Sequence, residues 1–144
     1  MCIILQLMLR FFWVFIFAIS SLWASAQTDI SRNYTITHGL PSNRVYHSMI
    51  DSEGFMWFGT EKGVSRYDGY AFENYTTRDG LTDNEVFYLF EDSKRRIWCM
   101  TYNGKLSYYY GGQFYNADNA PFLKNAISEA MFSRAYEDKW GNLV

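Results

Sequence analysis

The sequence predicts an all-β fold built from β-propeller blades, and three observations support this prediction. A pattern of short strand-like segments and tight turns recurs about every 40 residues. The segments are rich in residues that favour strands, and the chain of 144 residues holds twelve Tyr, twelve Phe and five Trp. Glycines separate the segments where the chain must reverse. We therefore expect four-stranded antiparallel sheets, in an incomplete propeller of about two and a half blades.

The repeat becomes visible when the chain is laid on itself with a shift of 41 residues. Asn33-Tyr34-Thr35 then returns as Asn74-Tyr75-Thr76, and twelve positions between residues 33 and 63 are identical. One inserted residue moves the later matches to a shift of 42, and a third copy begins near Met131. Helical repeats of similar length are excluded, because no ten-residue stretch of the repeats keeps an apolar helical period without a glycine.

Each copy is expected to contain four strands. The first copy predicts them near residues 45–50, 55–60, 64–67 and 71–75, and the second near residues 86–91, 97–102, 106–110 and 114–116. These strands define one blade at residues 39–79, a second at 80–120 and the start of a third at 121–144, with a short helical turn between residues 121 and 131. Residues 33–38 match the last strand of a blade that has no predecessor, and we expect this orphan strand to complete the final blade of a closed ring.

The first 26 residues resemble an export signal. Arg10 supplies the positive charge, residues 11–23 form an apolar run, and Ala24-Ser25-Ala26 fits the small-residue cleavage rule. We expect cleavage after Ala26. The alternative is a retained membrane anchor, although the uninterrupted apolar run is shorter than the roughly 20 residues that span a bilayer. Both readings place the rest of the chain outside the cytoplasm, in the periplasm.

Composition and charge exclude several classes of function. The formal net charge of −2 gives no basic stripe for nucleic acid. Outside the leader only Cys99 remains, which allows neither an internal disulfide nor a cysteine zinc site. His38 and His47 have no third ligand at a useful spacing, so neither a metal nor a cofactor is predicted.

Ligand binding is expected where the loops between blades lead into the innermost strands. These loops meet at one face of a propeller and are less constrained by packing than the strands. Only Glu91 is acidic in the two innermost strands, and its counterpart is Ile50, so a paired-carboxylate hydrolase and any catalytic residue are not predicted. The candidate ligand-binding residues are Arg44, Tyr46, His47, Glu85, Phe87 and Tyr88.

The residues that recur between the copies are assigned to structure. Trp57 and Trp98 could stack on a sugar, but their identical places inside apolar strands favour packing between blades. Asp51 and Asp92 could bind calcium, but their turn sequences favour capping of their own turns. The full structural set is Gly39, Leu40, Asn43, Asp51, Gly54, Trp57, Gly59, Thr60, Gly63, Asp68, Gly69, Gly80, Leu81, Asn84, Asp92, Trp98, Thr101 and Gly104.

On these motifs the chain resembles the two-component regulator propeller repeat. The resemblance rests on Gly39-Leu40-Pro41-Ser42-Asn43 and on the amino-acid sequence of residues 51–60 and 63–69. It extends over residues 33–144. The second copy departs from it, with Arg95, Met100 and Tyr110 in place of Gly54, Gly59 and Asp68.

The resemblance implies a periplasmic sensor region of a sensor histidine kinase or hybrid two-component regulator, which signals through a phosphorelay. The parent protein would sit in the inner membrane, and its kinase is not encoded in these residues, so the chain itself is not expected to be an enzyme. The implied partners are a small molecule or glycan ligand, the remaining blades and the parent's kinase. Two alternatives are an exported propeller enzyme, a hydrolase or lyase acting on glycans, and a free-standing repeat that closes by self-association.

Overall fold

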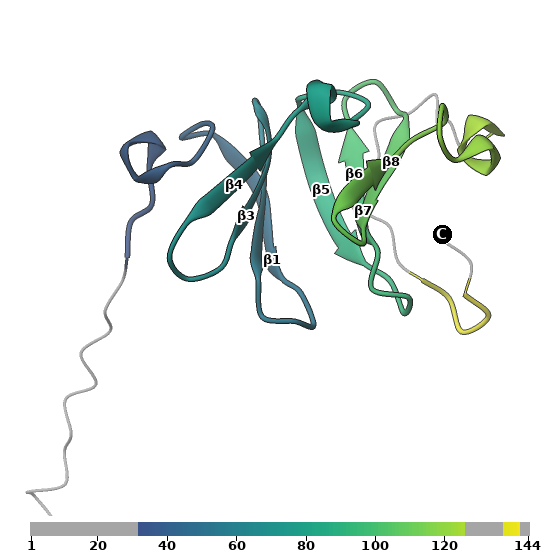
Figure 1. Cartoon of the computed structure of the whole chain (residues 1–144), viewed down its shortest axis with the longest axis horizontal. Coiled ribbons are helices and arrows are strands. Elements are labelled where there is room, and N and C mark those ends of the chain that lie inside the picture. Colours follow the sequence, from purple (N-terminus) through teal and green to yellow (C-terminus); the bar gives the residue numbers. More distant parts are fainter. Residues whose placement is uncertain (1–31, 126–136, 142–144) are drawn as a thin grey trace, which may run out of the picture. The chain divides into compact units, whose positions relative to one another are not determined.

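The computed structural model describes residues 32–125 and 137–141, which form the all-β arrangement that the sequence predicts. Two four-stranded antiparallel sheets follow one another along the chain (Figure 1), and each has its strands in sequence order. The expected leader lies outside the described residues, and so do residues 126–136 and 142–144 of the expected third blade. Over the described ranges no helix has the length and apolar character needed to cross a membrane.

The two sheets are propeller blades of one design. The first contains β1 (Val45–Ile50), β2 (Met56–Thr60), β3 (Gly63–Tyr67) and β4 (Phe72–Tyr75). The second contains β5 (Val86–Glu91), β6 (Ile97–Thr101), β7 (Leu106–Tyr110) and β8 (Gln113–Tyr115). Every strand lies within one residue of its predicted ends. Each innermost strand, β1 or β5, also carries an irregularity at the same place, between Val45 and His47 and between Val86 and Tyr88.

The main hydrophobic core lies between the two blades. It is formed by one face of the first sheet, with Trp57 and Val64, and by the facing side of the second, with Val86, Leu89 and Cys99. Side chains alternate along each strand, so each sheet contributes only every second residue to this core. Cys99 is completely buried in it, and burial raises the pKa of its thiol.

Each blade also has an apolar face that points away from the other blade. In the first blade, Phe58 and Tyr67 form this face with Leu40. In the second, Trp98 and Tyr108 pack against Leu123 of η4 (Pro121–Asn125), a short helix that lies in the stretch where a helical turn was expected. Because both faces of each sheet are apolar, each blade depends on a neighbour on either side.

Residues 33–38, which were expected to supply an orphan strand, are not paired in a sheet of the described residues. Residues 32–35 are irregular, and η2 (Ile36–His38) is a 3-10 helix whose counterpart in the second copy is η3 (Thr77–Asp79). No strand of the described residues pairs with this segment, and the partner expected for it, the final blade of a ring, is not among them, so the orphan strand stays a prediction. Its side chains pack instead, with the Tyr34 ring 5.0 Å from that of Tyr67 on the outer face of the first blade. Ring closure through this segment stays a prediction.

A repeated hydrogen-bonded contact joins consecutive blades at the ends of their innermost strands. The carboxylate of Glu91 accepts hydrogen bonds from the backbone N–H of Ser52 at 2.8 Å and from its hydroxyl at 2.6 Å. Glu137 accepts the same pair from Ser93, at 2.6 and 2.8 Å. We refer to each of these contacts as a Ser–Glu clasp. The start of the third copy is therefore attached to the second blade as the second is attached to the first.

An arginine lies over an aromatic ring in each blade, but the two residues have exchanged strands. In the first blade the guanidinium of Arg66 lies 4.6 Å from the centre of the Phe55 ring. In the second, Arg96 occupies the position of Phe55 and lies 5.2 Å from the ring of Tyr108, which occupies the position of Arg66. The favourable cation–aromatic contact is thus present in both blades.

The substituted turns of the second blade still form. Arg95 adopts a positive φ of 61° and donates its backbone N–H to Asp92, as Gly54 does to Asp51. The other replaced glycine has a packing reason: a Cβ on Gly59 would lie 2.7 Å from the backbone oxygen of Val86 in the next blade. Met100 takes this position in the second blade and packs in the cluster that contains Leu123.

Candidate functional site

The hairpin after each innermost strand is organised by one aspartate. In the first blade, Asp51 accepts hydrogen bonds from the backbone N–H groups of Glu53 and Phe55 and, at 2.7 Å, from the indole N–H of Trp57. Asp92 makes the equivalent set of bonds, including one of 2.8 Å from the indole of Trp98. These carboxylates therefore cap their own turns and hold the buried tryptophans, which agrees with the structural role predicted for them.

The entry to each innermost strand is organised by an asparagine. Asn43 accepts a hydrogen bond from the backbone N–H of Ile36 at 2.9 Å, and Asn84 accepts one from Thr77 at the same distance. Each bond fixes a 3-10 helix to the loop that leads into β1 or β5. Sequence reasoning missed these helices, although a capping threonine and a glycine flank each of them.

Four side chains of the innermost strands form a half-buried aromatic strip, made of Tyr46 and His47 on β1 and Phe87 and Tyr88 on β5. The ring centres of Tyr46 and Phe87 are 4.6 Å apart, and those of His47 and Tyr88 are 4.3 Å apart. The pairing follows from the repeat, since each ring contacts its equivalent in the next blade. The strip therefore crosses the boundary between the two blades.

Polar groups border the aromatic strip. The hydroxyl of Tyr46 donates a 2.7 Å hydrogen bond to Glu85 of the second blade, and this bond raises the pKa of Tyr46. Arg44 forms an ion pair of 3.2 Å with Glu61 and lines a hollow of about 480 Å³ together with Lys62. Five of the six predicted ligand-binding residues thus meet at the strip, and Arg44, which lines the neighbouring hollow, also interacts with Tyr46 of the strip. Their role in ligand binding stays a prediction.

Comparison with known proteins identifies the first repeat. Residues 39–62 match the family model described as the two component regulator propeller. They form a two-component regulator propeller repeat. The match includes β1, the Asp51 turn and β2, so it contains the first half of the aromatic strip and the glycine that allows the second blade to approach.

The propeller repeats also have counterparts among solved structures. The chain is similar to the extracellular domain of BT3049 from B. thetaiotaomicron, a provisionally assigned hybrid two component system, with a TM-score of 0.61 and 21% identity over 78% of this chain and 16% of that one. The extracellular domain of BT4673 from the same organism aligns with a TM-score of 0.41 and 16% identity, over 72% of this chain and 22% of that one. No curated protein matches the sequence. The chain thus spans about a sixth of the length of BT3049's domain, which shares its fold.

Other polar groups of the propeller repeats have structural partners. The Asn74 amide, which sits in one of two glycosylation-like triplets, donates a 2.8 Å hydrogen bond to Gly39 and accepts one from Ser65. Glu91, the acidic residue of the innermost strands, is held in its Ser–Glu clasp. Over residues 32–125 and 137–141, no three His, Cys, Asp or Glu side chains gather into a group that could hold a metal ion.

Because His47 contacts the next blade, we expect the free energy of unfolding to depend on pH. His47 accepts a 3.4 Å hydrogen bond from the backbone N–H of Leu89, and burial lowers its pKa below the ordinary value of 6.5. As the pH falls below about 6.5, the unfolded chain takes up this proton before the folded chain does, so the free energy of unfolding decreases until the folded pKa has been passed. Urea unfolding between pH 7.5 and 5 measures this decrease.

The matched variants for this measurement are His47→Gln and His38→Gln. Glutamine at position 47 does not titrate, so that variant should lose the part of the pH dependence that His47 supplies. The His38→Gln chain should retain it, because His47 is unchanged. Equal slopes in the wild type and in His47→Gln would contradict the assignment.

Proposed function

We propose that the chain is part of a periplasmic sensory module of a two-component signal transduction protein. The observation that carries this proposal is the two-component regulator propeller repeat at residues 39–62. The export signal expected at residues 1–26 and the fold shared with the extracellular domain of BT3049 support a location outside the cytoplasm. The parent protein would carry further blades, a membrane span and a histidine kinase.

The aromatic strip is the place where the sensor binds its ligand. The rings of Tyr46 and Phe87 offer apolar faces, and Glu85 offers a hydrogen-bonding carboxylate beside them. A small molecule or a glycan with a flat or ring-shaped body and hydroxyl groups fits this combination. The strip's location supports a sensory role, because one ligand there contacts both blades at once.

The signal would arise from a change in how the two blades are arranged. A ligand that contacts Tyr46 on one blade and Phe87 on the next binds more tightly to one arrangement of the blades than to another. It can shift the equilibrium only by this difference in affinity. The Tyr46–Glu85 hydrogen bond connects the same two blades, so breaking it should change the unliganded equilibrium as well.

The proposal is tested first in the gene and then in membranes. The reading frame that continues past Val144 should encode more propeller repeats, a membrane span and a kinase; a different sequence there would overturn the proposal. In membranes that contain the full-length protein, Tyr46→Ala and Glu85→Gln should change kinase autophosphorylation and its response to a glycan panel. Arg78→Gln, an exposed change on η3, is the control and should behave as the wild type does.

A further inference from the structure

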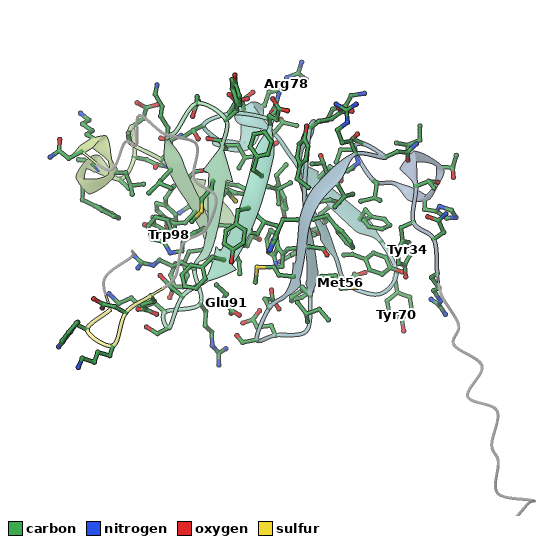
Figure 2. All side chains as sticks on the ribbon, turned by 180° about the vertical axis from the view of Figure 1, so that it is seen from behind. Tyr34, Met56, Tyr70, Arg78, Glu91 and Trp98 are labelled. Carbon is green, nitrogen blue, oxygen red and sulfur yellow. The ribbon has the colours of Figure 1, made fainter. Side chains whose placement is uncertain are left out.

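The first blade has one side that the described part of the chain covers only in part. Figure 2 shows Tyr34 on this side, which points away from the second blade. The outer strands are covered here, because Tyr34 and Leu40 pack in one cluster with the buried side chains of Phe58 and Tyr67. None of the described residues covers the innermost strand in the same way. We refer to its exposed residues on this side as the open side of β1, which consists of Val45, Ser48 and Ile50.

The equivalent side of the second blade is covered by the first blade. Val86 and Leu89 correspond to Val45 and Ser48, and both are buried in the core between the blades. Val45 is 39% exposed instead, and Ser48 is exposed as well. Both innermost strands carry their irregularity at the same place, so equivalent residues point to the same side. The open side of β1 is therefore built like a junction between blades, and a preceding blade is the occupant that fits it.

The end of β1 differs in its chemistry from the end of the other innermost strands. Glu91 and Glu137 each accept two hydrogen bonds from a serine of the preceding blade in a Ser–Glu clasp. Ile50 takes this position in the first blade and is 65% exposed. Its aliphatic side chain accepts no hydrogen bond, so a serine on the neighbouring blade would find no partner there. An apolar residue on that blade would bury Ile50, which is favourable.

The start of β1 differs in its charge. Glu85 of the second blade accepts a 2.7 Å hydrogen bond from Tyr46 of the first. Arg44 takes the place of Glu85 in the first blade and lines the hollow of about 480 Å³. With Lys62 and Glu61 in the same lining, the hollow carries one positive charge in excess. A carboxylate on the neighbouring blade would complement this charge across the junction.

We infer that the open side of β1 binds a closing blade of the same propeller that differs from the first blade at both ends of its innermost strand. The closing blade has an apolar residue where the first blade has Ser52, and a carboxylate where it has Tyr46. Contact between a last and a first blade is general in closed propellers. The specific point is that this junction selects the blade that it accepts.

The same chemistry disfavours association between copies of the chain. The second blade of another copy would offer Ser93 to Ile50, so no Ser–Glu clasp would form. It would offer Phe87, which has no group that accepts a hydrogen bond, to Arg44. These two mismatches favour the closing blade over head-to-tail association, which can otherwise grow into open filaments.

The test uses the full-length protein with the substitution Ile50→p-benzoylphenylalanine, a residue that forms cross-links on irradiation. Digestion and mass spectrometry should then give a cross-link within the same polypeptide, to the residue of another blade that is equivalent to Ser52. That residue should be apolar. Tyr70→p-benzoylphenylalanine is the control, because Tyr70 is 95% exposed, and it should give no cross-link to another blade.

A stability measurement tests the same contact without a label. Ile50→Glu places an unpaired carboxylate in the closed junction and should lower the melting temperature of the propeller in the full-length protein by about 3 °C or more. Tyr70→Glu, the same kind of change at an exposed residue, should leave it unchanged, and so should Ile50→Leu, which keeps the apolar contact.

Several outcomes would overturn the inference. These are a cross-link from position 50 to a second copy, no cross-link to any blade, a serine or threonine at the mapped position, and an unchanged melting temperature in Ile50→Glu. The inference rests on the further blades proposed for the parent protein, but not on its sensory role. Neither measurement needs a ligand, so a failure here is distinguishable from a failure of the sensory function, which kinase autophosphorylation reports.

Discussion

Replacement of Asp92 by alanine is expected to lower the free energy of unfolding by about 4 kcal/mol. The Asp92 side chain is 0% exposed and accepts hydrogen bonds from two backbone N–H groups, from the Trp98 indole and, at 2.6 Å, from Arg96. Removing one partner of a buried ion pair leaves the other charge uncompensated, which costs about 3–5 kcal/mol. Urea unfolding of the full chain at pH 7 measures the loss.

Asp92→Asn separates the contribution of charge from that of shape. Burial raises the pKa of Asp92, but the hydrogen bonds from Trp98 and Arg96 outweigh this effect, and the pKa is lowered below its ordinary 3.8. The carboxylate thus stabilises the fold above that value, and the stabilisation is lost as the pH falls through the lower folded pKa. The asparagine variant should be less stable than the wild type at pH 7 and lose this acid dependence. A loss below 1 kcal/mol in Asp92→Ala would contradict the proposed role.

Gly63→Ala is the second substitution with a large expected effect, a loss of about 3 kcal/mol. Gly63 begins β3 with a φ of 124°, which side-chain-bearing residues rarely adopt, and a Cβ there would overlap the carbonyl oxygen of Tyr75 on β4. The unfavourable backbone conformation costs about 1–2 kcal/mol and the steric overlap adds about 1–3 kcal/mol. Thermal and urea unfolding both report the change.

Gly69→Ala is the matched control for this substitution. Gly69 also has a positive φ, of 98°, but a Cβ there would have nothing within 4 Å. This variant therefore isolates the conformational cost, about 1–2 kcal/mol. Similar losses in the two variants would mean that the contact with Tyr75 does not limit the residue at position 63.

The strands could be predicted from the sequence because two independent signals coincide in each copy. Aromatic and β-branched residues mark the strands, and glycines that need a positive φ, such as Gly54 and Gly63, mark their ends. The orphan strand expected at residues 33–38 stays a prediction, whereas the 3-10 helix at Ile36–His38 was missed. Its match to the last strand of a blade describes residues only, whereas a strand also requires a partner in space.

Contacts between blades were predicted only where the repeat itself implies them. The neighbouring positions of Tyr46 and Phe87 follow from equivalence, because like residues of adjacent blades face one another. The Ser–Glu clasp could not be predicted from this equivalence. The first copy has Ile50 at the position of Glu91, so a glutamate at the end of the innermost strand does not recur in both blades.

The exchange of an arginine and an aromatic residue between strands has a consequence for recombination among the repeats. A hybrid with a phenylalanine at position 96 beside Tyr108 would hold no cation, and one with an arginine at position 108 would place a second cation beside Arg96, which already lies over the Trp98 ring. Each pair works only when both of its members come from the same parent. The smallest piece that keeps such a pair together is therefore the hairpin of a blade's second and third strands, and single strands are not modular.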